Sequence, residues 1–278
     1  MSVSLRAVGL LPHPTRETAA VLARHASERL AAHGIDVRGP AEDDRGTLDP
    51  EGLDVIISLG GDGTMLRAVD LAYEAGVPVL GVNVGQMGYL AEVEPDDFDA
   101  ALDRLVAGDY EVAERMVLEM TVVSAGTARG HWFALNEAVL EKVHTGRLAR
   151  LEVEINGTYF TTYAADGVIV ATPTGSTAYS FSARGPIVSP RQQCVLLTPV
   201  SPHMLFDRSL VLAADEELRF EVSDDRSVVL TADGRELGDL AAGDAVTCTG
   251  GPKPARVVTF GPRDFHQILK TKFGLADR

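Results

Sequence analysis

A glycine-rich turn between an apolar strand and a helix constrains this chain more than any other feature. The apolar run 55–57 is typical of a buried strand, and it leads through Leu59 into Gly60-Gly61-Asp62-Gly63-Thr64. Residues 65–72 then have the pattern of a helix. Glycines let a backbone approach an anion closely, and a helix N-terminus points N–H groups at it. The arrangement predicts a phosphate site, whereas the structural alternative is an ordinary turn with Asp62 as helix N-cap.

The aspartate of this turn has a chemical implication of its own. A carboxylate beside a phosphate repels it, unless the carboxylate accepts a proton or faces a metal ion. Asp62 is therefore a candidate general base.

The first third of the chain predicts an open parallel sheet. Apolar strand patterns at 7–11 and 77–83 alternate with helical patterns from Thr15 to about 32 and over 95–107. Ligands of such sheets lie beyond the carboxyl ends of the strands. The turns at 60–63 and 83–88 are both expected at that edge.

The texture changes after about residue 115, where short runs of β-branched and aromatic residues predict a β-rich domain. The expected strands are 117–123, 132–141, 150–156, 158–163, 209–212, 217–222, 227–232 and 245–249. Asn156-Gly157 predicts a tight hairpin between two of them. Residues 264–273 return to an amphipathic helical pattern, and we place the domain boundary near residue 112.

Composition excludes several classes of partner. The chain has 278 residues and a formal charge of −15, which disfavours nucleic acids and anionic membranes. It contains no apolar run of membrane-spanning length and no signal-peptide pattern, so we expect a cytoplasmic protein. Cys194 and Cys248 are isolated, which favours buried thiols in a reducing compartment over a disulfide or a metal site.

The basic residues are unusual. Lysine supplies only four of the 25 Lys and Arg residues. Together with the acidic charge, this predicts a salt-adapted cytoplasm, where screening removes carboxylate repulsion. A GC-rich genome would explain the arginine but not the charge.

A second motif combines a strand with a hydroxyl-rich loop. The strand 166–171 runs into Thr172-Pro173-Thr174-Gly175-Ser176-Thr177-Ala178-Tyr179. Hydroxyls suit a sugar or a phosphate, and Tyr179 could stack on a flat ring. The alternative is a loop that caps its own helix through Ser176 or Thr177. Asn136-Glu137, in the apolar run 133–140, is a weaker signal, because one of the two is expected to face solvent.

These motifs, with Thr198-Pro199-Val200-Ser201-Pro202-His203, resemble in order and spacing the ATP-NAD kinase family from about Val8 to Phe273. The GGDG turn alone is shared with phosphofructokinases and diacylglycerol kinases. The resemblance implies an α/β fold with an N-terminal open parallel-sheet domain (1–112), a C-terminal β-rich NAD-binding domain (113–260), and a C-terminal segment (261–278) that returns to the first domain. With the charge, it suggests a salt-adapted archaeon as the source.

The resemblance also implies an activity, the phosphorylation of the adenosine 2′-hydroxyl of NAD by ATP with Mg²⁺ or another divalent cation. Asp62 is placed as base at that ribose, Gly60, Gly61 and Gly63 at the ATP phosphates, and Asp166 near the nicotinamide. The full set implied for NAD is Asp62, Gly63, Tyr89, Asn136, Glu137, Asp166, Thr174, Thr177, Ala178, Tyr179 and Ser182.

Some features depart from the family pattern or leave alternatives open. Ala183-Arg184-Gly185 stands where paired glycines are usual, Ala164-Ala165 where some members carry a basic residue, and no lysine clamp for phosphate is evident. A non-catalytic dinucleotide sensor and a lipid kinase of the diacylglycerol kinase type are the alternatives. NAD and ATP are the expected partners, and exposed strand edges favour a homodimer or homotetramer.

Overall fold

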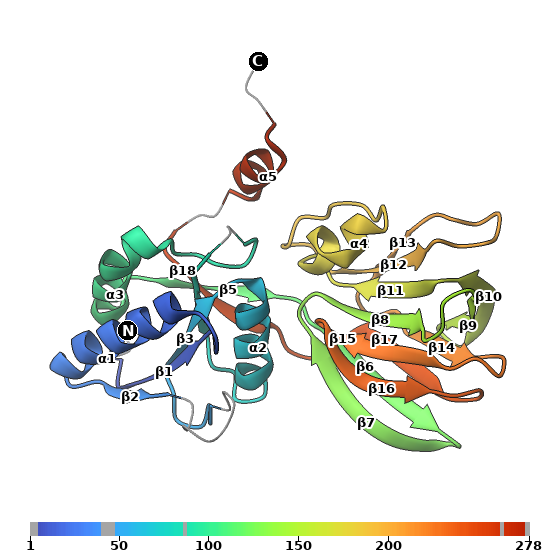
Figure 1. Cartoon of the computed structure of the whole chain (residues 1–278), viewed down its shortest axis with the longest axis horizontal. Coiled ribbons are helices and arrows are strands. Elements are labelled where there is room, and N and C mark those ends of the chain that lie inside the picture. Colours follow the sequence, from blue (N-terminus) through green and yellow to red (C-terminus); the bar gives the residue numbers. More distant parts are fainter. Residues whose placement is uncertain (1–4, 40–47, 86–87, 262–263, 276–278) are drawn as a thin grey trace. The chain divides into compact units, whose positions relative to one another are not determined.

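The computed structural model describes residues 5–39, 48–85, 88–261 and 264–275. The chain divides into two compact units (Figure 1). Unit 1 comprises Met1–Glu114 with Ala255–Arg278, and unit 2 comprises Arg115–Pro254.

Unit 1 is built on a six-stranded sheet of order β2-β1-β3-β4-β18-β5. The strand pairs from β2 to β18 are parallel. The strands are β1 (Ala7–Pro12), β2 (Asp36–Arg38), β3 (Val55–Gly60), β4 (Val79–Asn83), β5 (Glu111–Arg115) and β18 (Ala255–Thr259). This confirms the predicted open parallel sheet. The short strand β2 was not predicted, because its pattern is too short to show periodicity.

Helices cover both faces of this sheet (Figure 1). The helices on these faces are α1 (Glu17–Ala32), α2 (Asp62–Tyr73) and α3 (Phe98–Ala107), and the 3₁₀ turn η1 (Pro95–Asp97) precedes α3. Helix α5 (Phe265–Phe273) follows β18 and is drawn apart from the sheet in Figure 1. Apolar residues of α1 and α3, such as Leu30 and Phe98, share a core with alternate strand residues such as Val8 and Ile57. Helix α2 packs on the other face. The α5 helix has no buried residue.

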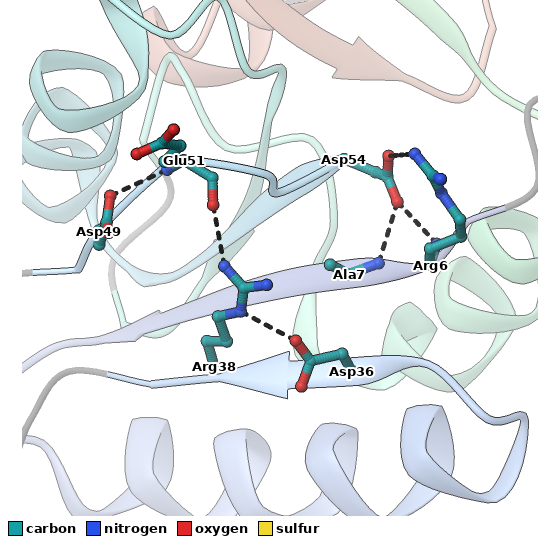
Figure 2. A network of polar contacts seen from close by, with 7 residues as sticks. All are labelled: Arg6, Ala7, Asp36, Arg38, Asp49, Glu51 and Asp54. Carbon is teal, nitrogen blue, oxygen red and sulfur yellow. Dashed lines mark hydrogen bonds and ion pairs between the residues drawn. The ribbon is translucent and has the colours of Figure 1, made fainter.

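A polar network joins β1 and β2 to the segment that precedes β3 (Figure 2). Asp54 Oδ2 accepts the backbone N–H groups of Arg6 (2.7 Å) and Ala7 (2.9 Å). Arg38 on β2 donates to Asp36 (2.9 Å) and to the carbonyl of Glu51 (2.8 Å). The glycine-rich turn lies at the opposite, carboxyl end of β3.

Unit 2 contains two six-stranded antiparallel sheets, of order β10-β9-β14-β17-β6-β7 and β13-β12-β11-β8-β15-β16. Its elements are β6 (Leu118–Ser124), β7 (Thr127–Ala134), β8 (Glu137–Lys142), β9 (Ala149–Ile155), β10 (Thr158–Ala165), β11 (Gly167–Ala171), η2 (Gly175–Thr177), α4 (Tyr179–Ser182), β12 (Cys194–Val200), β13 (Leu210–Ala213), β14 (Leu218–Val222), β15 (Val228–Ala232), β16 (Arg235–Leu240) and β17 (Ala245–Gly250). The β-rich prediction is confirmed, including the hairpin at Asn156-Gly157.

The burial of the strands explains their sequence patterns. In β6 buried and half-buried residues alternate, which is typical of a strand with one face on a core. All five residues of β11 are buried. One face of β11 contributes Val168 and Val170 to the core shared by both sheets, and the other contributes Ile169 to a smaller cluster with Tyr179 and Val188.

Several details of the predicted elements are corrected. Helix α1 begins at Glu17 after an extended Arg16, so Thr15 is not its N-cap. The predicted strand run 132–141 is interrupted at Leu135 and Asn136. Much of the predicted loop 39–52 lies outside the described residues. Both cysteines are buried and free, as expected. Within the described part of the chain, no helix is long and apolar enough to span a membrane.

Candidate active site

A pocket of about 490 Å³ lies at the carboxyl ends of β1 and β3 in unit 1. The backbone N–H of His13, just after β1, donates to the carbonyl of Leu59 on β3 (2.9 Å), so the two strand ends open at one place. The pocket is lined by Leu11, Pro12, His13, Pro14, Arg16, Gly61, Asp62, Gly63, Thr64, Arg67 and Gly88. It contains most of the predicted glycine turn.

Asp62 is the first residue of α2, and its carboxylate is held from outside the helix. The backbone N–H of Tyr89 donates to Oδ2 (2.9 Å) and that of Leu90 to Oδ1 (3.1 Å). The N-cap is Gly61, without a side-chain hydrogen bond, so the alternative of Asp62 as an ordinary N-cap is wrong. A carboxylate oxygen has two lone pairs, so each oxygen keeps capacity to accept a further proton.

The glycines of this region fall into two groups. A Cβ on Gly60 would lie 2.1 Å from Thr64 Oγ1, and one on Gly88 would lie 2.0 Å from Asp62 Oδ1. These two glycines permit close packing. A Cβ on Gly61 or Gly63 would meet nothing within 4 Å among the described residues. Their absent side chains leave open space at the pocket.

The pocket wall includes basic side chains that the sequence analysis missed: Arg16, Arg67 and His13. Arg16 approaches Gly85 so closely that a Cβ on this glycine would lie 2.2 Å from its Nη1. A signal existed in the sequence, because residues just after one parallel strand lie beside those after its neighbour. Arg16 follows the first strand and the glycine turn follows the next.

Tyr89 lies beside Asp62 and contacts a residue of helix α5. Lys272 Nζ stands 3.9 Å from the centroid of the Tyr89 ring, a cation–π contact. Partial burial, and then the charge of Asp62, raise the pKa of Tyr89. The second predicted turn therefore meets the first through Asp62, as the sheet topology required.

In unit 2, Leu135 and Asn136 form the turn between β7 and β8, and Glu137 is the first residue of β8. Asn136 and Glu137 are both 8% exposed, so the expectation that one of them faces solvent is wrong. Thr172 holds this turn, because its hydroxyl donates to the carbonyl of Leu135 (2.5 Å) and its N–H to that of Asn136 (2.8 Å). A Cβ on Gly175 would lie 2.1 Å from the carbonyl oxygen of Asn136. Packing therefore requires this glycine.

Glu137 is a buried carboxyl group with an altered protonation equilibrium. Burial raises its pKa to about 8, the negative charge of Asp233 adds to that rise, and a hydrogen bond with the backbone of Tyr179 opposes it. Its Oε2 atom is buried without a hydrogen-bond partner in the described structure. Such an atom is able to receive a polar group of a ligand.

In the hydroxyl-rich loop, some side-chain hydroxyls form hydrogen bonds within the loop region, and another has no partner among the described atoms. Ser176 Oγ accepts the N–H of Val188 (3.0 Å) and donates to its carbonyl (3.2 Å). Thr177 Oγ1 donates to the carbonyl of Thr174 (3.4 Å). The buried hydroxyl of Thr174 has no partner among the described atoms. Ala178 is half-buried, and Ser182 is exposed.

Two further polar pairs lie in unit 2. Lys142 on β8 forms an ion pair with Asp166, a contact absent from the sequence analysis. The hydroxyl of Tyr179 donates to Glu141 Oε1 (3.2 Å). Partial burial and then Glu141 raise the pKa of Tyr179. Arg184 is exposed with φ of 66°, and the described residues include no acidic ion-pair partner for it.

The predicted residues thus form one cluster in each unit. Asp62, Gly63 and Tyr89 belong to unit 1, and the remaining residues implied for NAD belong to unit 2. In the described ranges, no group of three or more His, Cys, Asp or Glu side chains is arranged to hold a metal ion.

Comparisons with known proteins agree with these motifs. Residues 40–110 match the ATP-NAD kinase N-terminal domain, and residues 135–260 match the ATP-NAD kinase C-terminal domain. An NAD kinase of Heliobacterium modesticaldum is 45% identical over 221 residues, covering 79% of this chain and 78% of that protein. An NAD kinase of Syntrophotalea carbinolica is 35% identical, covering 99% of this chain and all of that protein.

Two solved structures share the fold. Yeast NADH kinase, solved with NADH, has a TM-score of 0.87 at 24% identity, covering 99% of this chain and 89% of that one. An Archaeoglobus fulgidus NAD kinase, solved with ATP, has a TM-score of 0.74 at 24% identity, covering 98% of this chain and all of that one. The sequence relatives named above are bacterial, so the expected archaeal, salt-adapted source is not supported. On the matched domains and these identities, the chain belongs to the ATP-NAD kinase family.

Proposed function

We propose that this NAD kinase transfers the γ-phosphoryl group of ATP to the adenosine 2′-hydroxyl of NAD, giving NADP, with Asp62 as general base. The observation that carries the proposal is the Asp62 carboxylate, which is fixed by two backbone N–H groups at the wall of a pocket that also contains basic side chains. No P-loop or lysine clamp occurs in the sequence, so this pocket is the candidate phosphate site.

The chemistry assigned to Asp62 follows from its geometry. A ribose hydroxyl is a weak nucleophile, and a carboxylate within hydrogen-bond reach accepts its proton as the phosphoryl group arrives. The N–H groups of Tyr89 and Leu90 orient the carboxylate and leave one lone pair on each oxygen for that proton. The remaining catalytic requirement is positioning and charge stabilisation of the phosphoryl group.

The pocket offers the donor phosphates two kinds of contact. Gly60, Gly61 and Gly63 surround the N-terminus of α2, where backbone N–H groups favour an anion, and the space beside Gly61 and Gly63 is open. Arg16 and Arg67 supply positive charge from the wall. These arginines replace the lysine clamp that the sequence lacks.

A divalent cation fits this arrangement as part of the substrate. Mg²⁺ in such sites is bound by substrate phosphates with one or two carboxylates and water. Asp62 is the carboxylate of the pocket, so we expect Mg²⁺ to enter as MgATP and to neutralise phosphate charge.

For NAD, we propose the cluster in unit 2 together with Asp62, Gly63 and Tyr89. The buried Oε2 of Glu137 and hydroxyl of Thr174 are polar atoms that a ribose can satisfy. Asp166 is paired with Lys142, which lowers its net charge toward the nicotinamide. The other proposed contacts are Asn136, Thr177, Ala178, Tyr179 and Ser182.

We also propose a cytoplasmic homodimer or homotetramer. Edge strand β10 of unit 2 exposes Tyr159 (57%) and Phe160 (39%). Phe160 contacts Phe206, and the neighbouring Leu205 is fully exposed. An apolar edge of this kind is a candidate self-association surface. Sedimentation of wild type and of Leu205→Ser tests this, and equal masses would remove that surface from the proposal.

The donor assignment is tested by KM values in an NADP⁺-formation assay. We expect Arg16→Gln to raise the KM for ATP about tenfold, because a charge-assisted hydrogen bond is lost. The KM for NAD should not change. Arg24→Gln, at an exposed position of the helix α1 that follows Arg16, is the control and should match wild type. An unchanged KM for ATP in Arg16→Gln would remove this residue from the donor site.

A further inference from the structure

Two hairpin turns of unit 2 share a conformation but use their side chains differently. Asn156-Gly157 joins β9 to β10, and Asp233-Gly234 joins β15 to β16. Their φ values are 51° and 71° in the first turn and 49° and 77° in the second, as in the tight turns that fit twisted hairpins. Asn156 Oδ1 accepts one backbone N–H, that of Glu217 just before β14 (2.9 Å).

The side chain of Asp233 reaches a segment about a hundred residues earlier. Its Oδ2 accepts the N–H of Leu135 (2.7 Å), and its Oδ1 accepts those of Asn136 (2.8 Å) and Glu137 (3.1 Å). The N–H of Asp233 itself donates to the carbonyl of Glu137 (3.0 Å). One residue therefore contacts the backbone of three consecutive residues.

These contacts supply hydrogen-bond acceptors to buried backbone N–H groups of residues 135–137. Leu135 and Asn136 lie between β7 and β8, outside both strands, and they are buried. A buried backbone N–H without an acceptor is costly, and a carboxylate supplies two oxygens for three such groups. The β15–β16 hairpin does not need the Asp233 carboxylate for its own closure. A left-handed residue followed by glycine is sufficient for that, as at Asn156.

We propose that Asp233 is a positioning residue for NAD, whose carboxylate fixes the backbone of Leu135, Asn136 and Glu137 and thereby aims the Asn136 and Glu137 side chains at the substrate ribose. This inference rests on the proposed function, because it takes these two side chains as the ribose contacts. Thr172 and Gly175 hold the same turn from its other side. Asp233 fixes the N–H groups, and Thr172 fixes the carbonyl groups.

The test compares Asp233→Gly with Asn156→Gly. Glycine adopts the left-handed conformation without strain, so each variant removes a side-chain acceptor and keeps its hairpin. Asp233→Asn is the conservative variant, because one oxygen still faces Asn136 and Glu137. The measurements are NAD affinity by calorimetry without ATP, the separate KM values for NAD and ATP, and amide hydrogen exchange at residues 135–137.

We expect Asp233→Gly to weaken NAD binding at least tenfold, to leave the KM for ATP unchanged and to accelerate exchange at 135–137. Asp233→Asn should lie between that variant and wild type, and Asn156→Gly should match wild type. If Asp233→Gly fails to fold, weakened NAD binding in folded Asp233→Asn supports the inference. Unchanged NAD affinity, or an equal rise in both KM values, overturns it. Calorimetry reads NAD binding without turnover, so a failure of the kinase proposal remains distinguishable.

Discussion

Each unit has a motif that contains glycine, and the glycines of the two motifs have different surroundings. In the unit 1 motif, Gly61 and Gly63 face open space beside a pocket, and a methyl group on either would touch nothing described within 4 Å. In the unit 2 motif, Gly175 is pressed against the backbone of Asn136, 2.1 Å from where its Cβ would stand. The first motif leaves space for a ligand. The second motif packs against another segment of the same chain, so it affects ligand contacts only indirectly.

The acidic residues differ in the same way. Asp62 is half-buried and accepts two backbone N–H groups, so it is suited to act as a fixed anion at an open pocket. Glu137 is buried, with a pKa raised to about 8. It is therefore largely protonated at neutral pH and suited to binding rather than to proton abstraction. A conspicuous motif therefore indicates where a site lies, whereas the surroundings of each residue decide the role of that residue.

Among the substitutions that test this comparison, Asp62→Asn should have the largest effect on activity. We expect kcat to fall about 10²–10⁴-fold, as for loss of a general base, while NAD binding is largely kept. An asparagine oxygen still accepts one of the two N–H groups at the 89–90 turn. The measurement is steady-state NADP⁺ formation together with NAD calorimetry.

The matched control is Asp97→Asn, the same change at the N-terminus of α3, where the side chain makes no cap hydrogen bond. It should behave as wild type. Near-normal turnover of Asp62→Asn would exclude Asp62 as the base.

Gly175→Ala should mainly reduce stability. The added methyl group would stand 2.1 Å from the Asn136 carbonyl oxygen and 2.5 Å from its carbon, both backbone atoms that cannot rotate away. We expect a loss of about 1–3 kcal/mol in the free energy of unfolding, with weakened NAD binding. Urea denaturation measures the first effect. Wild-type stability would show that the turn relaxes easily.

Gly63→Ala should separate activity from stability in the other direction. The site is open and lies in the first turn of α2, where alanine is favoured over glycine by about 0.5–1 kcal/mol. We expect equal or slightly higher stability with a raised KM for ATP, because the methyl group occupies phosphate space. An unchanged KM for ATP would contradict a donor site at this glycine.

Glu137→Gln should change how stability depends on pH. Below about pH 4.5 the Glu137 carboxyl is protonated in both folded and unfolded chains, because 4.5 is its ordinary pKa. Between pH 4.5 and about 8 the unfolded chain releases the proton and the folded chain keeps it, so wild-type stability falls as pH rises. The slope is at most about 1.4 kcal/mol per pH unit. Glutamine removes this loss.

The stability of Glu137→Gln relative to wild type should therefore rise from pH 4.5 to 8 and then stay level. Glu236→Gln, an exposed position on β16, serves as control. A flat difference across this range would mean that Glu137 is ionised in the folded protein.

Local sequence patterns predicted the parts of the fold that depend on neighbouring residues. The strand-turn-helix around Gly60–Gly63 and the Asn156-Gly157 hairpin follow from turn chemistry and apolar periodicity. The approach of Tyr89 and Leu90 to Asp62 agrees with the rule that parallel strands end at one edge. Arg16 could have been found by the same rule.

Contacts between distant segments were beyond this reasoning. Asp233 and Leu135 are about a hundred residues apart, and no local pattern shows that one caps the other. The pairing of Lys142 with Asp166 depends on the antiparallel register of β8 and β11. Burial of both Asn136 and Glu137 was missed because Asn136 lies in a turn before the strand that begins at Glu137, so strand alternation does not apply to the pair.

Phosphoryl transfer from ATP to NAD with Asp62 as general base is tested by an assay of NADP⁺ formation. The assay contains NAD⁺, ATP and Mg²⁺, and NADP⁺ is detected with an NADP⁺-specific dehydrogenase. We run it at low salt and in molar KCl, because salt screens the repulsion among the acidic side chains of a chain with a charge of −15. We expect NADP⁺ in at least one buffer and its loss in Asp62→Asn. A protein that binds NAD⁺ but forms no NADP⁺ in either buffer, even with polyphosphate as donor, would contradict this expectation and would instead be a dinucleotide sensor.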